Sequence, residues 1–339
     1  MRLLRNIVTI AILLVPTAVF AQTAGQEPLR YVVSPETPGP YERVLIQIEG
    51  VGNFLGHATI TWPQDGAVVN QGAGEHSYSF MTGALGSRTT IGATVVSPAE
   101  GTFSRTFVFS PSVVTMVWES DTTAPPLYRG KTLYSAGSQL KVLAFPTVFS
   151  GGSRITTGSL SYQWRRNDEA VTEVSGLGRS IFTFTGDQLK DGETVAVDVY
   201  AGSVKVGHGE ITIPVTQPRV ILYQYNALRG PLYDMALPAA ISLGSKEITI
   251  KAEPYFFARE SKQNNTLAYD WQLNGESVSG PDTTRGILTL RQAGAGAGEA
   301  SLSVSLQNLD SSKLVQAAEA ALGLVFGESG SALGNLFGL

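Results

Sequence analysis

The chain has 339 residues, no cysteine, 43% hydrophobic residues and a formal net charge of −4. The hydrophobic content excludes a chain that stays disordered. The acidic balance and the lack of any run rich in lysine and arginine argue against nucleic acid as a partner, because a phosphate backbone requires a basic surface. Without disulfide bonds, each folded unit must be held together by packing alone.

The first 21 residues have the pattern of a secretory signal peptide. Arg2 and Arg5 form a positive start, an apolar run extends from Ile7 to Val15, and Val19-Phe20-Ala21 provides a cleavage site. The run is too short to cross a hydrocarbon core of about 30 Å. We therefore expect export to the periplasm, the cell surface or the medium. The alternative is that this segment is not cleaved and anchors the chain in the membrane. We expect no other contact with a membrane.

Three tryptophans in similar settings indicate an internal repeat. ATITW ends at Trp62, LSYQW ends at Trp164 and LAYDW ends at Trp271, with spacings of 102 and 107 residues. Each segment alternates apolar and polar residues, which predicts a half-buried strand. Arg166-Asn167-Asp168 and Leu273-Asn274-Gly275 follow the second and third tryptophans, and such residues tolerate the positive φ of a chain reversal.

The repeat extends to both sides of the tryptophans. Residues 138–149 and 246–257 share the pattern Ala-x-Pro-x-x-Phe, and residues 42–50 take the same place in the first unit. About seven short strands per hundred residues, with turns every 8–12 residues, are typical of a β-sandwich. The sequence therefore predicts an all-β chain of three tandem units at 30–111, 112–216 and 217–326. A flexible tail at 327–339, rich in glycine and serine, follows them.

These motifs resemble the immunoglobulin-like and PKD-like repeats of bacterial exported proteins. Tyr-x-Trp followed by Asn-Gly or Asn-Asp is similar to their strand C, and residues 189–197, with Asp191-Gly192, are similar to their E–F corner. The resemblance implies three tandem immunoglobulin-like β-sandwich domains after the signal peptide. Val195 and Val197 stand where the family usually has a tyrosine and a cysteine, so the tyrosine corner and the disulfide are missing.

The same resemblance implies a structural role for the aromatic residues of the repeated strand. Trp62, Trp164 and Trp271, with Tyr162 and Tyr269, are expected between the two sheets of each unit. The alternative role for the tryptophans is a platform on which sugar rings stack. Trp118 matches Tyr223 near the start of the next unit, so we expect it at a boundary between units.

The joints between the units are short and contain proline. Ser110-Pro111-Ser112 and Thr216-Gln217-Pro218 leave little slack, which favours a semi-rigid rod. Residues 313–326 are compatible with a helix, because they are rich in alanine, or with a final strand. The alternation of Leu322, Leu324 and Phe326 favours the strand.

The sequence offers little chemistry. His57, His76 and His208 do not form a zinc motif, and no G-x-S-x-G elbow is present, so we expect neither a cofactor nor an enzyme. Carboxylates are densest in GDQLKDGE, where Asp187, Asp191 and Glu193 form a weak candidate calcium site. A solvated turn is the favoured interpretation of that segment.

We expect a non-enzymatic envelope or cell-surface protein that acts as a semi-rigid spacer, adhesion or protein-interaction module, with an unidentified protein partner on the cell envelope. One alternative is an array of carbohydrate-binding modules, which requires exposed aromatic residues. The candidates for these are Tyr255, Phe256 and Phe257, with Tyr31 and Tyr41. A second alternative is an accessory component of a pilus or secretion assembly.

Overall fold

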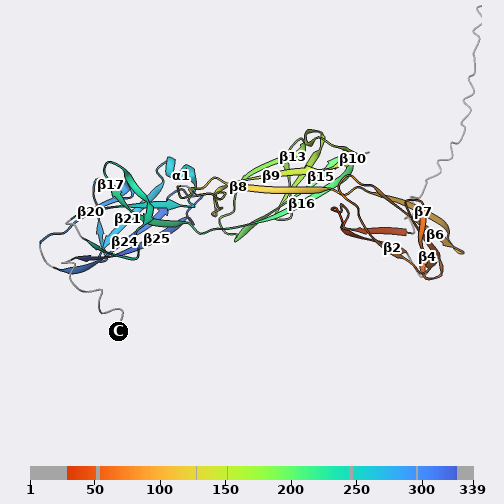
Figure 1. The fold of residues 1–339 in the computed structure, drawn as a ribbon, viewed down its shortest axis with the longest axis horizontal. Coiled ribbons are helices and arrows are strands. Elements are labelled where there is room, and N and C mark those ends of the chain that lie inside the picture. The colour runs from red at the N-terminus through yellow and green to blue at the C-terminus, as the bar shows by residue number, and fades with distance from the viewer. Residues whose placement is uncertain are drawn as a thin grey trace, which may run out of the picture.

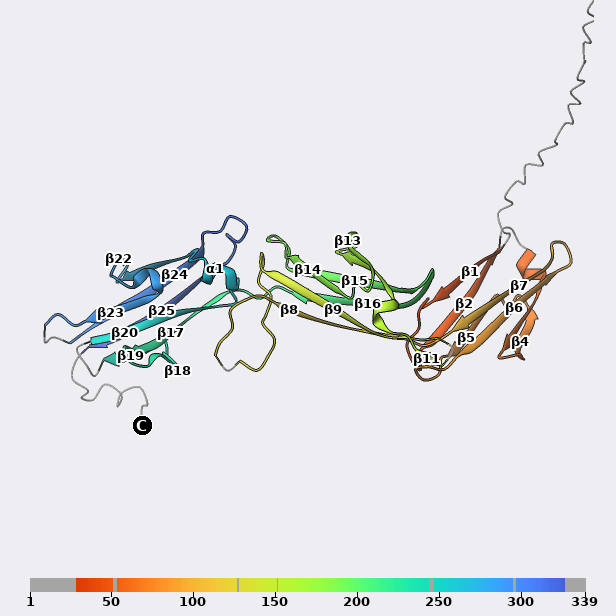
Figure 2. The ribbon, with the colours of Figure 1, turned by 90° about the horizontal axis from the view of Figure 1, so that it is seen from above.

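The computed structural model describes residues 29–50, 54–126, 128–150, 152–243, 247–294 and 297–326. The predicted signal peptide at 1–21 and the predicted tail at 327–339 lie outside these residues. Strands dominate the described residues, in which the one α-helix is α1 (Arg259–Gln263) and the 3-10 segments η1 (Phe54–His57), η2 (Thr157–Ser159) and η3 (Thr283–Arg285) are short. The strands form three groups that follow one another along an extended molecule (Figures 1 and 2).

The first group is a sandwich of a three-stranded and a four-stranded antiparallel sheet. The strand orders are β1-β2-β5 and β4-β3-β6-β7. The strands are β1 (Leu29–Ser34), β2 (Arg43–Gly50), β3 (Thr59–Gln64), β4 (Ala67–Ala73), β5 (Ser77–Met81), β6 (Thr89–Ser97) and β7 (Gly101–Phe109). Residues 44, 46 and 48 of β2 alternate inward with exposed neighbours, as expected for a sheet that is buried on one face.

The second group repeats this arrangement with the orders β14-β9-β8 and β13-β12-β15-β16. The strands are β8 (Val113–Ser120), β9 (Gln139–Thr147), β12 (Ser161–Arg166), β13 (Glu169–Leu177), β14 (Ile181–Thr185), β15 (Gly192–Ala201) and β16 (Val204–Pro214). A two-residue ladder between β10 (Phe149–Ser150) and β11 (Ser153–Arg154) is added to it. Figure 2 places this group between the other two.

The third group has the orders β18-β17-β20-β23 and β19-β25-β24-β21-β22. The strands are β17 (Arg219–Asn226), β18 (Gly230–Ala236), β19 (Ala240–Leu243), β20 (Glu247–Tyr255), β21 (Leu267–Leu273), β22 (Glu276–Val278), β23 (Ile287–Arg291), β24 (Gly298–Asn308) and β25 (Ala317–Phe326). Strand β19 pairs with β25 in parallel. The C-terminal segment is therefore a strand from Ala317 onward, and it pairs with β24 along its whole length.

Seven strands recur in every group once β10, β11, β18 and β19 are left out. The first, second and fifth of these form one sheet, and the third, fourth, sixth and seventh form the other. This is an immunoglobulin-like sandwich in which the fourth strand pairs with the third instead of joining the sheet of the first, second and fifth strands. A separate hydrophobic cluster fills the space between the sheets of each group. The prediction of an all-β chain of tandem immunoglobulin-like repeats is confirmed. None of the helices in the described part of the chain has the length and apolar character needed to cross a bilayer.

The strand that carries the core tryptophan ends in the same turn in all three sandwiches. Both central residues have positive φ: 48° and 89° at Asp65-Gly66, 50° and 67° at Asn167-Asp168, and 54° and 84° at Asn274-Gly275. These values are those of a two-residue hairpin turn, which suits the twist of antiparallel strands. The turn after Trp62 thus belongs to the repeat although its sequence, Pro63-Gln64-Asp65-Gly66, resembles the others little.

Candidate functional site

The three repeated tryptophans lie inside the sandwiches. Trp62, Trp164 and Trp271 are 0%, 1% and 1% exposed. Each indole N–H donates to a backbone carbonyl, at 2.8 Å to Glu75, 2.8 Å to Arg179 and 3.3 Å to Thr283. Because these rings are enclosed, the alternative role as sugar-stacking platforms is wrong. Tyr162 is buried in the core of the second sandwich, and Tyr269 packs half-buried against the core of the third.

Trp118 belongs to the core of the second sandwich, in contrast to the expected boundary position. Leu143 of β9 and Lys251 of β20 take the same position in their repeats. The strand register pairs Leu143 with Val117 and Lys251 with Tyr223. Val117 is therefore the structural counterpart of Tyr223, one residue before Trp118. A shift of one residue along a strand changes the face to which a side chain points. Trp118 is 8% exposed, and the ammonium of Lys131 lies 3.4 Å from its ring centroid.

The candidate calcium site is occupied by a protein cation. Glu193 is fully buried and accepts hydrogen bonds from Arg166 Nε and Nη2 at 2.9 and 2.7 Å, from Asn167 Nδ2 at 2.9 Å and from the Asp187 N–H at 2.7 Å. Burial raises the pKa of Glu193, but these hydrogen bonds outweigh it and hold the pKa below its usual value. Asp191 is exposed. The Glu193 carboxylate already pairs with Arg166, and among the described residues no group of three acidic or histidine side chains suited to a metal occurs.

A tyrosine from elsewhere in the chain serves the corner that lacks its usual tyrosine. The hydroxyl of Tyr134, which is fully buried, donates to the carbonyl of Asp187 at 3.3 Å. Its ring lies so close to Gly186 that a Cβ there would collide with the phenol. Because Tyr134 is about fifty residues upstream of the corner, a local motif search does not find it.

Tyr255, Phe256 and Phe257 are 2%, 9% and 0% exposed, so the prediction that they form an interaction surface is wrong. Segment 121–138, which connects β8 to β9, covers them from the second sandwich. Thr123 exchanges backbone hydrogen bonds of 2.8 Å with Phe256 and Phe257, and Leu133 packs against the aromatic cluster. Of the other aromatic candidates, Tyr41 is 68% exposed, and Tyr31 packs edge-to-face against Phe107 at 5.6 Å.

A buried amide completes this contact between the second and third sandwiches. Gln316 is 0% exposed and precedes the last strand. Its Nε2 donates to Ser135 Oγ at 3.1 Å, Ala136 O at 2.9 Å and Ser138 Oγ at 2.9 Å. Its Oε1 accepts from Ala258 N and Asn308 Nδ2, both at 3.0 Å. We call this set of six residues the Gln316 junction.

The contact between the first and second sandwiches is lighter. Ser112 donates its N–H to the carbonyl of Pro38 at 3.1 Å. Lys205 lies 3.2 Å from Glu36 of the first sandwich and 3.0 Å from Asp198 of the second. The Glu36 side chain is 68% exposed, so water competes for this ion pair.

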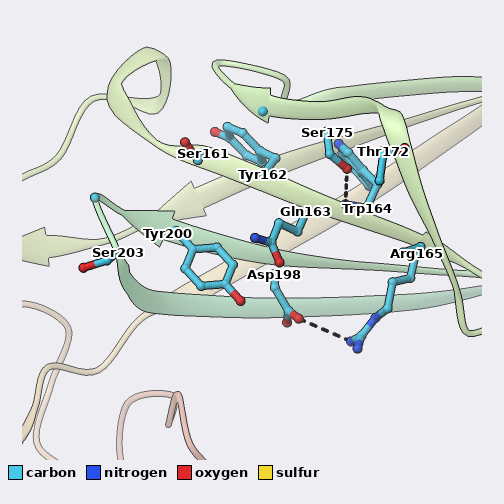
Figure 3. A pocket seen from close by; sticks show the side chains of 13 residues that line it. Ser161, Tyr162, Gln163, Trp164, Arg165, Thr172, Ser175, Asp198, Tyr200 and Ser203 are labelled. Carbon is cyan, nitrogen blue, oxygen red and sulfur yellow. Dashed lines mark hydrogen bonds and ion pairs between the residues drawn. The ribbon is translucent and has the colours of Figure 1, made fainter.

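The second sandwich has a groove of about 740 Å³ along β12, β13 and β15 of its four-stranded sheet, and the buried Tyr162 and Trp164 also border it. Figure 3 shows Tyr200, Gln163, Asp198 and Arg165 following one another along it. These side chains come from the outward positions of β12 and β15, where Gln163 is paired with Asp198. One side is formed by β13, whose pairing with β12 is irregular between Tyr162 and Trp164, and one end by the turn at Gly202-Ser203.

The charges at the floor of this groove compensate one another. Asp198 is 8% exposed, and it lies 2.7 Å from His208 Nδ1, 3.0 Å from Lys205 Nζ and 3.5 Å from Arg165 Nη2. Burial raises the pKa of Asp198, but the hydrogen bonds from His208 and Lys205 outweigh this effect, so the pKa lies below its usual value. Asp198 is therefore a fixed carboxylate. His57 and His76 belong to the first sandwich, away from this groove.

The sequence singles out Tyr162 and Trp164 but neither the other residues of the groove nor those of the Gln316 junction. Gln163 and Arg165 alternate with the buried Tyr162 and Trp164, so the period of the strand alone places them on the outer face. No local pattern marks Gln316, because its partners Ser135 and Ala136 are 181 and 180 residues away.

No family model matches the chain, and no curated protein matches it. Among solved structures, it is similar to the three N-terminal domains of the highly immunogenic outer capsid protein of bacteriophage RB49, with 12% identity, 88% and 98% of the two chains covered and a TM-score of 0.25. It is also similar to the central fibronectin-III array of RIM-binding protein, with 11% identity, 89% of this chain and 98% of that chain covered, and a TM-score of 0.28. A third similar structure contains immunoglobulin domains 1–4 of Sidekick-1, with 14% identity, 88% of this chain and 74% of that chain covered, and a TM-score of 0.21. TM-scores this low support no conclusion about function.

Proposed function

We propose that this protein is a non-enzymatic, exported, semi-rigid spacer that presents interaction surfaces to a protein partner on the cell envelope. Its units are those predicted at 30–111, 112–216 and 217–326. The Gln316 junction is the observation that carries the proposal. A buried polar network fixes the second and third units to each other, because separating them would leave several buried donors and acceptors without partners.

The junction also explains why a rod is favoured over a flexible string. A covered aromatic cluster and two backbone hydrogen bonds at Thr123 add to the Gln316 contacts. Between the first and second units we find, among the described residues, an ion pair whose Glu36 is exposed, one backbone hydrogen bond, and the Phe149 ring beside Gly86, but no buried polar network. We therefore infer a rigid pair of units, 112–326, with the first unit attached by a joint that bends more easily.

The outer face of the four-stranded sheet in the first sandwich supports a protein-contact role. Along β3, β6 and β7 the outward positions are threonine, serine, valine, glycine and proline, and none of them is charged. Val96 and Val108 on this face are 45% and 51% exposed. Protein interfaces are depleted of charge at their centre, whereas a free surface usually carries many charges.

Distance measurements between spin labels test the spacer. Since the chain has no cysteine, labels are introduced at Ala67→Cys, Glu169→Cys and Glu276→Cys, which are exposed and follow the equivalent turn in each unit. The pair at 169 and 276 should give a narrow distance distribution, and the pair at 67 and 169 a broader one. A broad distribution for 169 and 276 would contradict the proposal.

The partner and export are tested separately. N-terminal sequencing of the protein from cell envelopes should begin at Gln22. Thr94→Lys, which places a charge on the outer face of the first sandwich, should abolish cross-linking to the partner. Thr183→Lys is the matched control, because Thr183 is an exposed threonine of a strand, β14, in the second sandwich. Cross-linking that survives Thr94→Lys would remove this face as the contact.

A further inference from the structure

We propose that the groove on the outer face of the second sandwich is a binding site for a neutral oligosaccharide, with Tyr200 as the stacking surface and Gln163 as the main hydrogen-bonding group. The proposal deepens the proposed interaction role by assigning a ligand class to one surface. The spacer role does not depend on it, since the Gln316 junction lies elsewhere.

The size and shape of the groove fit a short chain of sugar rings. Small-molecule sites usually have volumes of about 300–1,000 Å³, and this groove has about 740 Å³. Its floor is a sheet, whose residues are held by the strand ladders of β12 and β15. Figure 3 shows the Tyr200 ring and the Gln163 amide side by side along this floor. An aromatic face beside a planar amide suits a ring that has apolar C–H faces and polar edges.

The groove carries polar groups that the protein itself does not use. The Gln163 amide, the Tyr200 hydroxyl and the hydroxyls of Thr172 and Ser203 make no side-chain hydrogen bond with another described residue. Gln163 is exposed and Tyr200 is half-buried, so both are accessible. An amide offers donors and acceptors together, as sugar hydroxyl groups require.

The charge distribution favours a neutral ligand. Asp198 is surrounded by Arg165, Lys205 and His208, so its charge is already compensated. An anionic ligand would meet the fixed carboxylate of Asp198, and a cationic ligand would meet Arg165. A neutral, hydroxyl-rich ligand meets neither penalty, and it gains from polar groups that are held in place before binding.

The strand register shows that this combination occurs in the second sandwich alone among the three described sandwiches. The pair Gln163–Asp198 corresponds to Thr61–Thr94 in the first and to Asp270–Ser305 in the third. Tyr200, paired with Ser161, corresponds to Val96 and Gln307. The shared fold does not require an aromatic residue at this position, so its presence beside Gln163 calls for a separate explanation. A ligand provides one.

Isothermal titration of the full mature chain with neutral hexasaccharides tests the proposal. The probes are hexaoses of β-1,4-glucose, β-1,3-glucose, β-1,4-xylose and β-1,4-mannose, with an oligogalacturonate as the anionic comparison. We expect at least one neutral probe to bind. Tyr200→Ala and Gln163→Ala should each weaken its binding at least tenfold, and Tyr200→Phe should weaken it less than threefold.

Tyr128→Ala is the matched control, because Tyr128 is 42% exposed and lies outside the groove. It should bind as the unchanged protein does. Binding that Tyr200→Phe largely retains also separates loss of the site from loss of the fold. The proposal is overturned if no neutral probe binds, if binding survives Tyr200→Ala, if the anionic probe binds more tightly, or if a protein partner cross-links to the groove while all sugars fail. The spin-label distances stay the same in every case, so failure here is distinct from failure of the spacer.

Discussion

Each core tryptophan joins burial and hydrogen bonding in one side chain. The ring fills the space between two sheets, and the indole N–H donates to a backbone carbonyl in the segment just before β5, β14 or β23, the strands that belong to the opposite sheet. Removing the ring therefore creates a cavity and leaves a carbonyl without its partner. Large-to-small changes of this kind cost about 3–5 kcal/mol, which is a large part of the stability of a domain.

Trp164→Ala should unfold the second sandwich or lower its stability by about 3–5 kcal/mol. Trp164→Phe keeps most of the buried area and loses the hydrogen bond to Arg179, so it should cost about half as much. Chemical denaturation followed by circular dichroism measures both. A Trp164→Ala protein as stable as the unchanged one would show that the ring does not support the core.

Glu193 makes the second sandwich sensitive to acid. Its pKa is lower in the folded state than the ordinary value of 4.5, so its stabilising effect is complete above about pH 4.5 and is lost as the pH falls below that value. Glu193→Gln should lower Tm at pH 7 and reduce the fall in Tm between pH 4.5 and pH 2.5. Glu210→Gln, at an exposed position of β16, should leave the acid profile unchanged. Identical profiles for all three proteins would contradict the assignment.

Sequence reasoning at the residue scale succeeds where a side chain points inward on a periodic strand, as for Trp164. It fails where burial comes from another part of the chain. By sequence, three consecutive aromatic residues, Tyr255 to Phe257, are candidates for an exposed surface. In the structure segment 121–138 covers them. Glu193 has the spacing of a calcium ligand, and Arg166 supplies the cation from a different strand.

At the scale of elements, one turn recurs in three sequences and performs the same task. The side-chain oxygen of its first central residue accepts a hydrogen bond from the backbone of the neighbouring strand in the same sheet. The bonds are Thr90 N to Asp65 Oδ1 at 2.8 Å, Thr194 N to Asn167 Oδ1 at 3.0 Å, and Ser301 N to Asn274 Oδ1 at 2.9 Å. The turn therefore fixes the hairpin and ties it to the sheet.

Asn274→Ala should destabilise the third sandwich by about 2 kcal/mol, because it removes this hydrogen bond and places alanine at a φ of 54°. Asn265→Ala is the matched control, since Asn265 has the same φ of 54° and no side-chain hydrogen bond to another described residue. It should cost about 1 kcal/mol. Equal losses in denaturant titrations would mean that the hydrogen bond to Ser301 contributes nothing.

Most elements were predictable from their period, and the errors have a clear physical origin. Leu322, Leu324 and Phe326 alternate as β25 requires, and this pattern prevails over the helical propensity of the alanines. By sequence, Trp118 matches Tyr223, whereas the strand pairing makes Val117 the counterpart of Tyr223. Similarity between two aromatic residues does not fix the register of a strand. Pairing depends on the neighbouring strand, which a single segment does not contain.

At the scale of the whole molecule, the two joints differ in kind. The Gln316 junction is buried and polar, so its hydrogen bonds are costly to leave unmade. At the other joint the Glu36 carboxylate is exposed, so water competes for its ion pair with Lys205. The order of the units was predictable from the repeat, but this difference was not, because both joints contain a single proline in a short polar segment.

Calorimetry should detect the difference. In the unchanged protein, the second and third units should melt in one transition. Gln316→Ala should separate that transition into two and destabilise the pair by at least about 2 kcal/mol, because buried groups of Ser135, Ala258 and Asn308 lose their partner. Gln307→Ala, at an exposed position of β24, should keep the single transition. Two transitions in the unchanged protein would show that the units are independent.

The distance in sequence between Gln316 and its partners has a consequence for the order in which the protein matures. Ser135 and Ala136 are synthesised about 180 residues before the amide that they bind. Until then, segment 121–138 has no surface to cover, and Thr123 lacks its backbone partners at Phe256 and Phe257. The second unit thus reaches its final state only when almost the whole chain has left the ribosome, and a fragment that stops at residue 216 carries an open, unsatisfied end.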